Sequence, residues 1–274
     1  MNTLTLEKHC WAEIDLTALR ENYEYIRRTV GGPVCAVVKA DAYGHGDNVI
    51  ARVLQEAGAA GFAVSSLGEG RHLRRGGITT PILILGYADP TYAAVLAANG
   101  LITTCYSTEY AQALSAAAVK AGVKVKVHLK IDTGMGRYGF LPDELDQLLP
   151  IFKYMPGLHV TGIYTHLHSA FCNQKATIAQ AEAFQGVLDK LHAEGCGTGM
   201  AHMLNSAGLL KYPEYAMDGV RVGSAILGRV SVRGNWGLAR IGECQATVEE
   251  LRWLPKGHSC GYGAGWTAKK PTRV

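Results

Sequence analysis

Residues 34–46 read VCAVVKADAYGHG, an apolar run that ends in a lysine and then becomes polar and glycine-rich. The run is short and β-branched, which is typical of a strand buried on both faces of a parallel sheet. Lys39 stands at its carboxyl end, where α/β folds carry their chemistry. Gly44 and Gly46 would let the backbone approach a ligand closely. We therefore expect a functional lysine here, although a solvated strand-end lysine is the plainer alternative.

The chain has 274 residues, of which 48% are hydrophobic and 18% are charged, so it can bury a sizeable core. That length suits one large domain, or a barrel of about 240 residues with a small appendage. The net charge of +4 is spread along the chain, and no run of like charges predicts a nucleic-acid partner. Seven cysteines without a C-x-x-C pair indicate reduced thiols, which favours a cytoplasmic protein. We find neither a signal peptide nor an apolar stretch of about 18 residues.

An apolar strand followed by an alanine- and leucine-rich helix recurs eight times along the chain. A short strand over residues 3–14 precedes this repeat, with Asp15 as the cap of a helix over 16–30. The spacing suits right-handed crossovers, and eight such units predict an α/β fold, an eight-stranded parallel (β/α)8 barrel of the TIM type, over residues 12–240. The eight strands are expected at residues 34–39, 61–65, 82–85, 101–104, 124–131, 158–166, 201–204 and 219–222.

The strand-helix rhythm stops after about residue 240. Residues 243–253 alternate like an exposed antiparallel strand, a Pro-Lys-Gly turn follows, and residues 259–267 are glycine-rich. We therefore assign residues 1–11 and 241–274 to the beginning of a β-strand domain. Two strands alone are marginally stable, so this part would need the N-terminal strand or a partner to pack against.

Polar residues follow the strands of the predicted barrel and should converge on one mouth, because the carboxyl ends of parallel strands meet there. Ser206, Gly223 and Ser224 follow the last two strands, where barrels commonly bind phosphate through backbone amides and hydroxyls. Ser206 could equally cap a helix. The residues predicted at this mouth are Lys39, Tyr43, Arg137, His166, Asn205, Ser206, Arg221, Gly223 and Ser224.

Two short motifs invite assignments that their surroundings do not support. GMGRYG at residues 134–139 matches the dinucleotide fingerprint, but no helix opens directly after it and no acidic residue follows ~20 residues on. What remains is Arg137, whose planar fork suits a substrate carboxylate or a phenolate, the alternative being a solvated loop arginine. His166 and His168 form an H-x-H pair without a third ligand at a useful spacing, so we expect no metal site.

Four stretches closely resemble motifs of the alanine racemase family: VVKADAYGHG at residues 37–46, LKIDTGMGRYG at 129–139, MDGVRVGSAILG at 217–228 and HSCGYG at 258–263. They stand in family order, and the resemblance extends over essentially the whole chain. The later C-terminal motifs of the family have no counterpart. We therefore interpret the chain as a C-terminally truncated member of the family.

The resemblance implies a cofactor, pyridoxal 5′-phosphate, bound covalently by Lys39. It implies two catalytic bases, Lys39 on one face of the substrate and Tyr262 of the neighbouring subunit in a homodimer on the other. Arg137 would bind the substrate, and Lys130 would be carbamylated and orient Arg137. The cofactor-binding residues implied are Lys39, Tyr43, Leu85, His166, Asn205, Ser206, Arg221, Gly223 and Ser224.

Arg221, supported by His166, faces the pyridine nitrogen of the cofactor if the resemblance holds. Most pyridoxal enzymes place an acid there, which keeps the nitrogen protonated and makes the ring a strong electron sink. A charged arginine would instead leave the nitrogen unprotonated and suppress transamination. Ser224 stands where the family usually has a branched apolar residue, and we expect little loss from this difference.

The implied activity is interconversion of L- and D-alanine, with serine as a second candidate substrate, supplying D-amino acid for peptidoglycan. A non-catalytic pyridoxal-phosphate-binding barrel is the main alternative, since it would share Lys39 and the phosphate loops. A decarboxylase on a related barrel is disfavoured because such enzymes pair the pyridine nitrogen with an acid. Because the sequence contains only the opening strands of the β domain that holds Tyr262, we expect the chain to bind cofactor but to racemise poorly.

Overall fold

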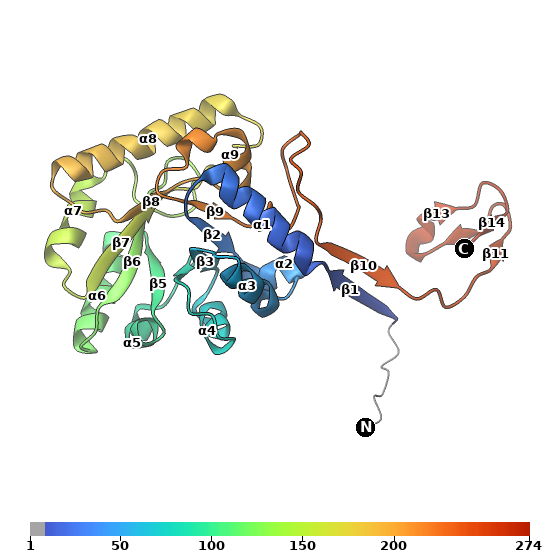
Figure 1. Cartoon of the computed structure of the whole chain (residues 1–274), viewed down its shortest axis with the longest axis horizontal. Coiled ribbons are helices and arrows are strands. Elements are labelled where there is room, and N and C mark those ends of the chain that lie inside the picture. Colours follow the sequence, from blue (N-terminus) through green and yellow to red (C-terminus); the bar gives the residue numbers. More distant parts are fainter. Residues whose placement is uncertain (1–8) are drawn as a thin grey trace, which may run out of the picture. The chain divides into compact units, whose positions relative to one another are not determined.

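The computed structural model describes residues 9–274, which fall into two compact units (Figure 1). The larger unit is Asp15–Ile241, and the smaller comprises residues 9–14 together with Gly242–Val274. Within the part of the chain that the structure describes, no helix combines the length and the apolar character needed to cross a bilayer.

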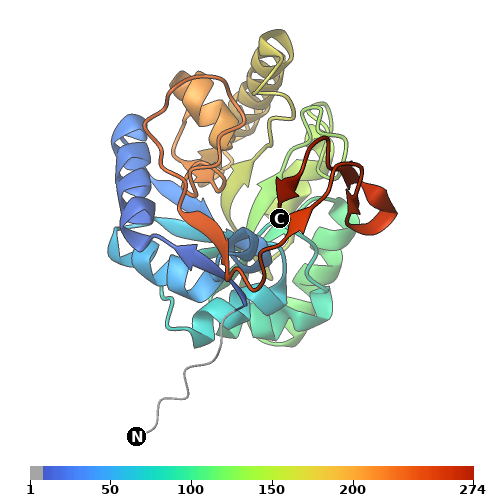
Figure 2. The same ribbon diagram turned by 90° about the vertical axis from the view of Figure 1, so that its right-hand side faces the viewer.

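The larger unit contains eight parallel strands: β2 (Val34–Val37), β3 (Gly61–Val64), β4 (Ile82–Ile84), β5 (Leu101–Cys105), β6 (Val125–Lys130), β7 (Leu158–Tyr164), β8 (Met200–His202) and β9 (Val220–Val222). Their spatial order is β8-β7-β6-β5-β4-β3-β2-β9. The two end strands approach each other through a bridge between His202 and Gly219, which nearly closes the sheet into a barrel. The helices surround these strands, as Figure 2 shows. The predicted eight-stranded parallel barrel is confirmed.

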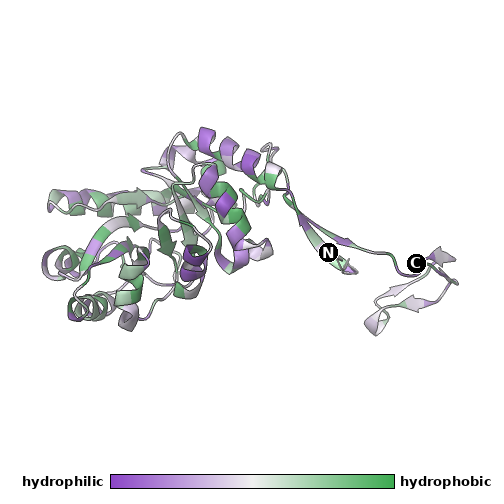
Figure 3. Cartoon of the chain, turned by 60° about the horizontal axis from the view of Figure 1, so that its bottom comes forward, coloured by the Kyte–Doolittle hydropathy of each residue, from purple (hydrophilic) through white to green (hydrophobic). Residues whose placement is uncertain are grey.

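The helices of this unit alternate with its strands and cover the outside of the barrel. Asp15 caps the first of them, because its side chain accepts hydrogen bonds from the N–H groups of Thr17 and Ala18, and Gly31 ends it with a φ of 66°. The barrel strands are mostly hydrophobic, whereas the helices carry both polar and apolar positions (Figure 3). The helices are α1 (Leu16–Val30), α2 (Lys39–Gly44), α3 (Asp47–Glu56), α4 (Leu67–Arg75), α5 (Ala93–Ala98), α6 (Thr108–Lys120), α7 (Leu145–Tyr154), α8 (Gln174–Ala193) and α9 (Ser206–Lys211).

Several polar side chains lie buried among the apolar residues of the barrel. Strands β3 and β4 are buried at every position, as their apolar sequences predict. Buried polar groups need hydrogen-bond partners, since leaving them unpaired costs stability. The buried polar residues of the barrel include Thr104, His128, Lys130, His202 and Arg221, and each of them needs a hydrogen-bond partner inside the barrel.

Some predicted boundaries are wrong by a few residues. Strand β2 ends at Val37, and Lys39 begins α2 because the backbone turns left-handed directly after it. Strand β7 ends at Tyr164, so His166 lies in the following loop. Of the first strand expected over residues 3–14, residues 10–14 form β1, and residues 3–8 lie outside the described part.

The smaller unit is built from antiparallel strand pairs. Strand β1 (Cys10–Ile14) pairs with β10 (Gly242–Ala246), so the N-terminal strand supplies the partner that the sequence suggested. The strand expected over 243–253 is shorter than predicted, because the ladder with β1 ends where Cys10 faces Ala246. The remaining pairs are β11 (Trp253–Leu254) with β14 (Thr272–Arg273), and β12 (Ser259–Cys260) with β13 (Trp266–Thr267), the latter flanking the 3-10 turn η3 (Tyr262–Ala264).

Candidate active site

A cavity of about 460 Å³ lies at the carboxyl ends of the barrel strands. Every site residue that the sequence predicted within the barrel lines it. Tyr262 belongs to the smaller unit, where it is fully exposed within η3. The predicted residues that line the cavity are Lys39, Tyr43, Leu85, Lys130, Arg137, His166, Asn205, Ser206, Arg221, Gly223 and Ser224.

The backbone after Lys39 forms a left-handed helical turn. The four residues Ala40–Tyr43 have φ between 50° and 56°, although none of them is glycine. This conformation costs roughly 1–2 kcal/mol per residue, so the surrounding structure must hold it in place. Glu69 of α4 does so with both carboxylate oxygens, which accept hydrogen bonds from the N–H of Ala40 at 3.0 Å and of Ser65 at 2.6 Å. The turn places Lys39 and Tyr43 on the same cavity.

Asp41 adds a second restraint on this turn. Its side chain accepts a hydrogen bond of 2.8 Å from the N–H of Asp47, the first residue of α3. Its backbone carbonyl accepts from the N–H groups of His45 at 2.9 Å and Gly46 at 3.0 Å. The turn is therefore tied both to α4 and to the start of α3.

Arg221 lies buried at the base of the cavity and is surrounded by acceptors. Its guanidinium donates to the carbonyls of Thr165 at 2.7 Å and His202 at 3.1 Å, and it also contacts the His202 ring through Nδ1. Its central carbon lies 4.7 Å from the ring centre of Tyr164, within cation–π distance. These contacts fix the position of a charge that the barrel encloses.

His166 lies beside Arg221, with its Nδ1 3.5 Å from the guanidinium. Burial, reinforced by the charge of Arg221 and of the other cavity cations, lowers the pKa of His166 to about 3. The ring is therefore neutral near pH 7, and it can accept a hydrogen bond from the guanidinium without repelling it.

Lys130 is the second buried cation of the site. Its Nζ donates to the carbonyl of Ile131 at 2.7 Å and lies 5.6 Å from the ring centre of Tyr164. Burial lowers its pKa to about 8, and the charges of Arg221 and Arg137 act in the same direction, while Asp132 partly offsets them. A substantial fraction of the amine is therefore neutral at mildly alkaline pH.

The loops after β8 and β9 form a group of hydroxyls and amides at another part of the cavity wall. Oγ of Ser206 accepts from the N–H groups of Gly223 at 3.3 Å and Ala225 at 3.2 Å. The Tyr43 hydroxyl packs against Gly223 so closely that a Cβ added there would lie 2.5 Å from the hydroxyl oxygen. Asn205 caps α9 by accepting from Gly208, so its role at the cavity is to position this loop.

Several contributors to the cavity were not predicted from the sequence. The Tyr138 hydroxyl donates to the Leu85 carbonyl, and the ring of Tyr164 lies within cation–π distance of both Arg221 and Lys130. Tyr164 could have been predicted from the sequence, because it stands two residues before His166 near the same strand end. Glu69 could not, because its role depends on contacts between segments that are distant in the sequence.

Residues 14–231 match the family model described as "Alanine racemase, N-terminal domain". An alanine racemase from Symbiobacterium thermophilum is 38% identical over 269 residues, which cover 96% of this chain and 71% of that protein. Among solved structures, alanine racemase from Streptomyces lavendulae has a TM-score of 0.91 at 28% identity, covering 98% of this chain and 73% of that one. Histidine racemase from Leuconostoc mesenteroides has a TM-score of 0.85 at 27% identity, covering 99% and 74%.

The family match includes the strands of the barrel and every cavity residue described above. The expected resemblance is confirmed, and with it an amino acid as the small-molecule substrate of a racemase. The chain belongs to the alanine racemase family, whose members depend on pyridoxal phosphate.

Proposed function

We propose that this chain interconverts L- and D-alanine by a two-base mechanism, with Lys39 as one base and Tyr262 of a second copy of the chain as the other. The observation that carries the proposal is the convergence of Lys39, Arg221 and the hydroxyl group of Ser206 on one cavity. Serine remains a second candidate substrate. The D-alanine formed would supply peptidoglycan synthesis.

The cavity residues fit pyridoxal phosphate. Among residues 9–274 no hydrogen-bond partner is found for the Nε–H of Arg221, a residue that lines the cavity, and this free donor suits an acceptor such as a pyridine nitrogen. The hydroxyls of Tyr43, Ser206 and Ser224 supply hydrogen-bond donors for a phosphate. Gly223 has no side chain, so the Tyr43 hydroxyl has room to lie beside it. Lys39 supplies the primary amine that an aldehyde requires.

When bound, pyridoxal phosphate withdraws electrons from Cα of the amino acid and makes its proton acidic. Lys39 would then accept or donate that proton on one face of Cα. Inversion requires a proton donor on the opposite face, within about 3 Å, and one side chain cannot reach both faces. Tyr262 of a second subunit fills this role in the proposal, which therefore also requires a homodimer.

Arg221 and neutral His166 would keep the pyridine nitrogen free of a proton. A guanidinium has no acceptor and does not lose its proton in proteins, so it can only donate to the nitrogen. The surrounding carbonyls hold the guanidinium in position. Arg137, exposed on the glycine-rich loop after β6, would bind the substrate carboxylate.

The test is proton exchange at Cα in deuterated water with the cofactor-loaded protein and either L-alanine or L-serine. Exchange with inversion supports racemisation, and the faster substrate identifies the preference. Loss of carbon dioxide would indicate a decarboxylase, and absence of exchange would indicate a non-catalytic carrier. Lys39→Ala should slow exchange by about 10²–10⁴-fold.

Subunit sharing has its own test. Lys39→Ala and Tyr262→Phe proteins are each expected to be nearly inactive, but mixed subunits can form one site with both bases intact. Recovery of activity on mixing supports the shared site. If mixing restores nothing although mixed dimers form, Tyr262 does not act across the interface.

A further inference from the structure

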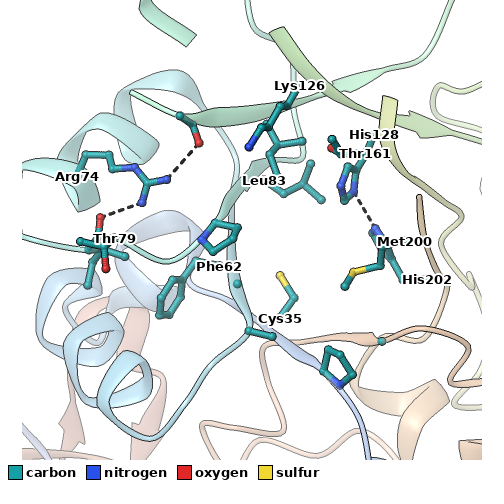
Figure 4. Close-up of a pocket in the computed structure, with 18 of the residues that line it drawn as sticks. Cys35, Phe62, Arg74, Thr79, Leu83, Lys126, His128, Thr161, Met200 and His202 are labelled. Carbon is teal, nitrogen blue, oxygen red and sulfur yellow. Dashed lines mark hydrogen bonds between the residues drawn. The ribbon is translucent and has the colours of Figure 1, made fainter. Parts of the chain in front are cut away.

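A second cavity, of about 720 Å³, lies at the amino-terminal ends of the barrel strands (Figure 4). It shares no lining residue with the candidate active site, so it lies at the opposite end of the barrel. Its volume falls within the range of about 300–1,000 Å³ typical of small-molecule sites. Nothing in the proposed racemase chemistry uses it.

The wall of this cavity is apolar with a positive charge balance. Phe62, Leu83 and Ile102 provide apolar surface, and no aspartate or glutamate lines the cavity. Arg74 and Lys126 are the permanently basic residues of the wall. An apolar wall with cations and without carboxylates favours a ligand that has an apolar body and a negative charge.

The two cations differ in what they can offer a ligand. Arg74 donates to the backbone carbonyls of Asn99, Ile78 and Thr80 at 2.7–2.8 Å, so most of its donors are occupied. Lys126 is exposed, and no salt bridge to it occurs among residues 9–274. Lys126 is therefore the cation available to an anionic group.

A chain of buried hydrogen bonds presents a further donor to this cavity. Arg221 can only donate, so Nδ1 of His202 must be the acceptor of their bond. Neutral His202 then carries its proton on Nε2, which lies 2.9 Å from Nδ1 of His128 and donates to it. Neutral His128 must in turn carry its proton on Nε2. Because Arg221 can only donate, each hydrogen bond of this chain has a fixed direction, and the Nε2–H of His128 is left as a donor. His128 lines the second cavity (Figure 4).

Lys126 and His128 are two residues apart on β6, so their side chains share one face of the strand. Both are donors, and a carboxylate has acceptor capacity for both. A neutral His128 can satisfy its Nε2–H with such an acceptor. Burial and the Arg221 charge lower the pKa of His128 to about 4, which keeps the ring neutral near pH 7.

We propose that the cavity at the amino-terminal end of the barrel binds a small carboxylate with an apolar, aromatic-sized body, whose carboxylate is held by Lys126 and by Nε2–H of His128. The apolar body lies against Phe62, Leu83 and Ile102. Binding there affects Arg221, because the hydrogen-bonded rings of His128 and His202 connect this cavity to Arg221 at the other end of the barrel.

Calorimetric titration of the cofactor-loaded protein with 1-naphthylacetate tests the site, with 1-naphthylacetamide as the uncharged comparison. The acid should bind about tenfold more tightly than the amide, and Lys126→Gln should remove most of that difference. Lys124→Gln is the matched control, because Lys124 is exposed on the same segment but does not line the cavity, and it should bind like the parent.

Ala60→Trp separates this cavity from the active site. Ala60 is exposed and lines the cavity, so a bulky side chain there should block binding without touching the residues around Lys39. The ring ¹⁵N signal of His128 Nε2 should shift on titration of the parent protein and stay unchanged in Ala60→Trp. Equal binding of the acid to parent and Ala60→Trp, or equal binding of acid and amide to the parent, would overturn the proposal.

Discussion

Glu69 and Ala40 are joined by a hydrogen bond of 3.0 Å, from the backbone N–H of Ala40 to the Glu69 carboxylate. Because the other oxygen of the same carboxylate accepts from Ser65, one side chain ties the left-handed turn after Lys39 to the end of β3. The position of Lys39 thus depends on a residue that does not line the cavity.

Glu69→Ala should relax this turn. Loss of two hydrogen bonds to a charged acceptor is expected to lower the free energy of unfolding by about 2–4 kcal/mol and to weaken cofactor binding. Denaturant unfolding and cofactor titration measure the two effects. Glu69→Gln retains one acceptor oxygen and should be intermediate, whereas Glu56→Ala, which removes an exposed glutamate, should change little. Normal cofactor affinity in Glu69→Ala would show that the left-handed turn keeps its conformation without the hydrogen bonds of Glu69.

Lys39 is expected to form the covalent link to pyridoxal phosphate, because it is the cavity lysine at the end of β2. Borohydride reduction of the loaded protein followed by peptide mass mapping should place the label on Lys39. The same treatment of Lys39→Ala should leave the peptide unlabelled. A label on Lys130 in the parent protein would contradict the assignment.

Lys130 should form a carbamate by attack of its neutral amine on the carbon dioxide that bicarbonate supplies, with release of one proton to solvent, because its pKa is lowered to about 8. The folded protein loses this proton well before an unfolded lysine does, so labelling should rise between about pH 7 and 9. Carbon NMR with ¹³C-bicarbonate detects the carbamate. The signal should be absent in Lys130→Met and unaffected in Lys124→Gln. Persistence of the signal in Lys130→Met would assign it to another amine.

Arg221→Glu should slow racemisation and raise transamination, because an acid at this position favours a protonated pyridine nitrogen. Pyruvate formed from alanine measures the side reaction. Charge reversal at a buried site can also unfold the barrel, so Arg221→Lys serves as a second variant that keeps the charge but loses the planar fork. An unchanged ratio of racemisation to transamination in folded Arg221→Glu would show that Arg221 does not face the nitrogen.

His128 makes the barrel sensitive to acid. Its pKa in the folded protein is about 4, against an ordinary value of 6.5, so between these values the unfolded chain binds more protons. The free energy of unfolding should therefore fall as the pH drops from about 6.5 to 4, by about 3 kcal/mol from this residue. Denaturant unfolding of His128→Gln should show a shallower pH dependence, whereas His159→Gln, at an exposed position, should behave like the parent. Equal pH dependence in all three proteins would contradict the buried neutral state.

The sequence predicted the barrel because its strands are short apolar runs at regular spacing, and β3 and β4 are indeed buried throughout. It also placed Lys39 and Arg221 at one mouth, since the carboxyl ends of parallel strands converge. It could not predict the left-handed turn, because alanine and tyrosine do not favour that conformation and Glu69 stabilises it from another segment.

The buried histidine pair was missed for a related reason. His128 and His202 lie on strands that are not consecutive in the sequence, and their hydrogen bond exists only after β7 pairs on both sides. The second cavity depends in the same way on how the strand beginnings meet. Local patterns identify elements, but contacts between distant elements require the folded chain.

Arg221 also joins the two strands at which the barrel nearly closes. Its backbone N–H donates to the Leu204 carbonyl at 3.0 Å, and its guanidinium donates to the carbonyl of His202 at the end of β8. Local opening of the barrel between β8 and β9 must therefore break the contacts of a residue that also lines the cavity of about 460 Å³. Amide hydrogen exchange in β8 and β9 should therefore slow when the cofactor binds. Cofactor binding and the closure of the barrel between these two strands would then be coupled through Arg221.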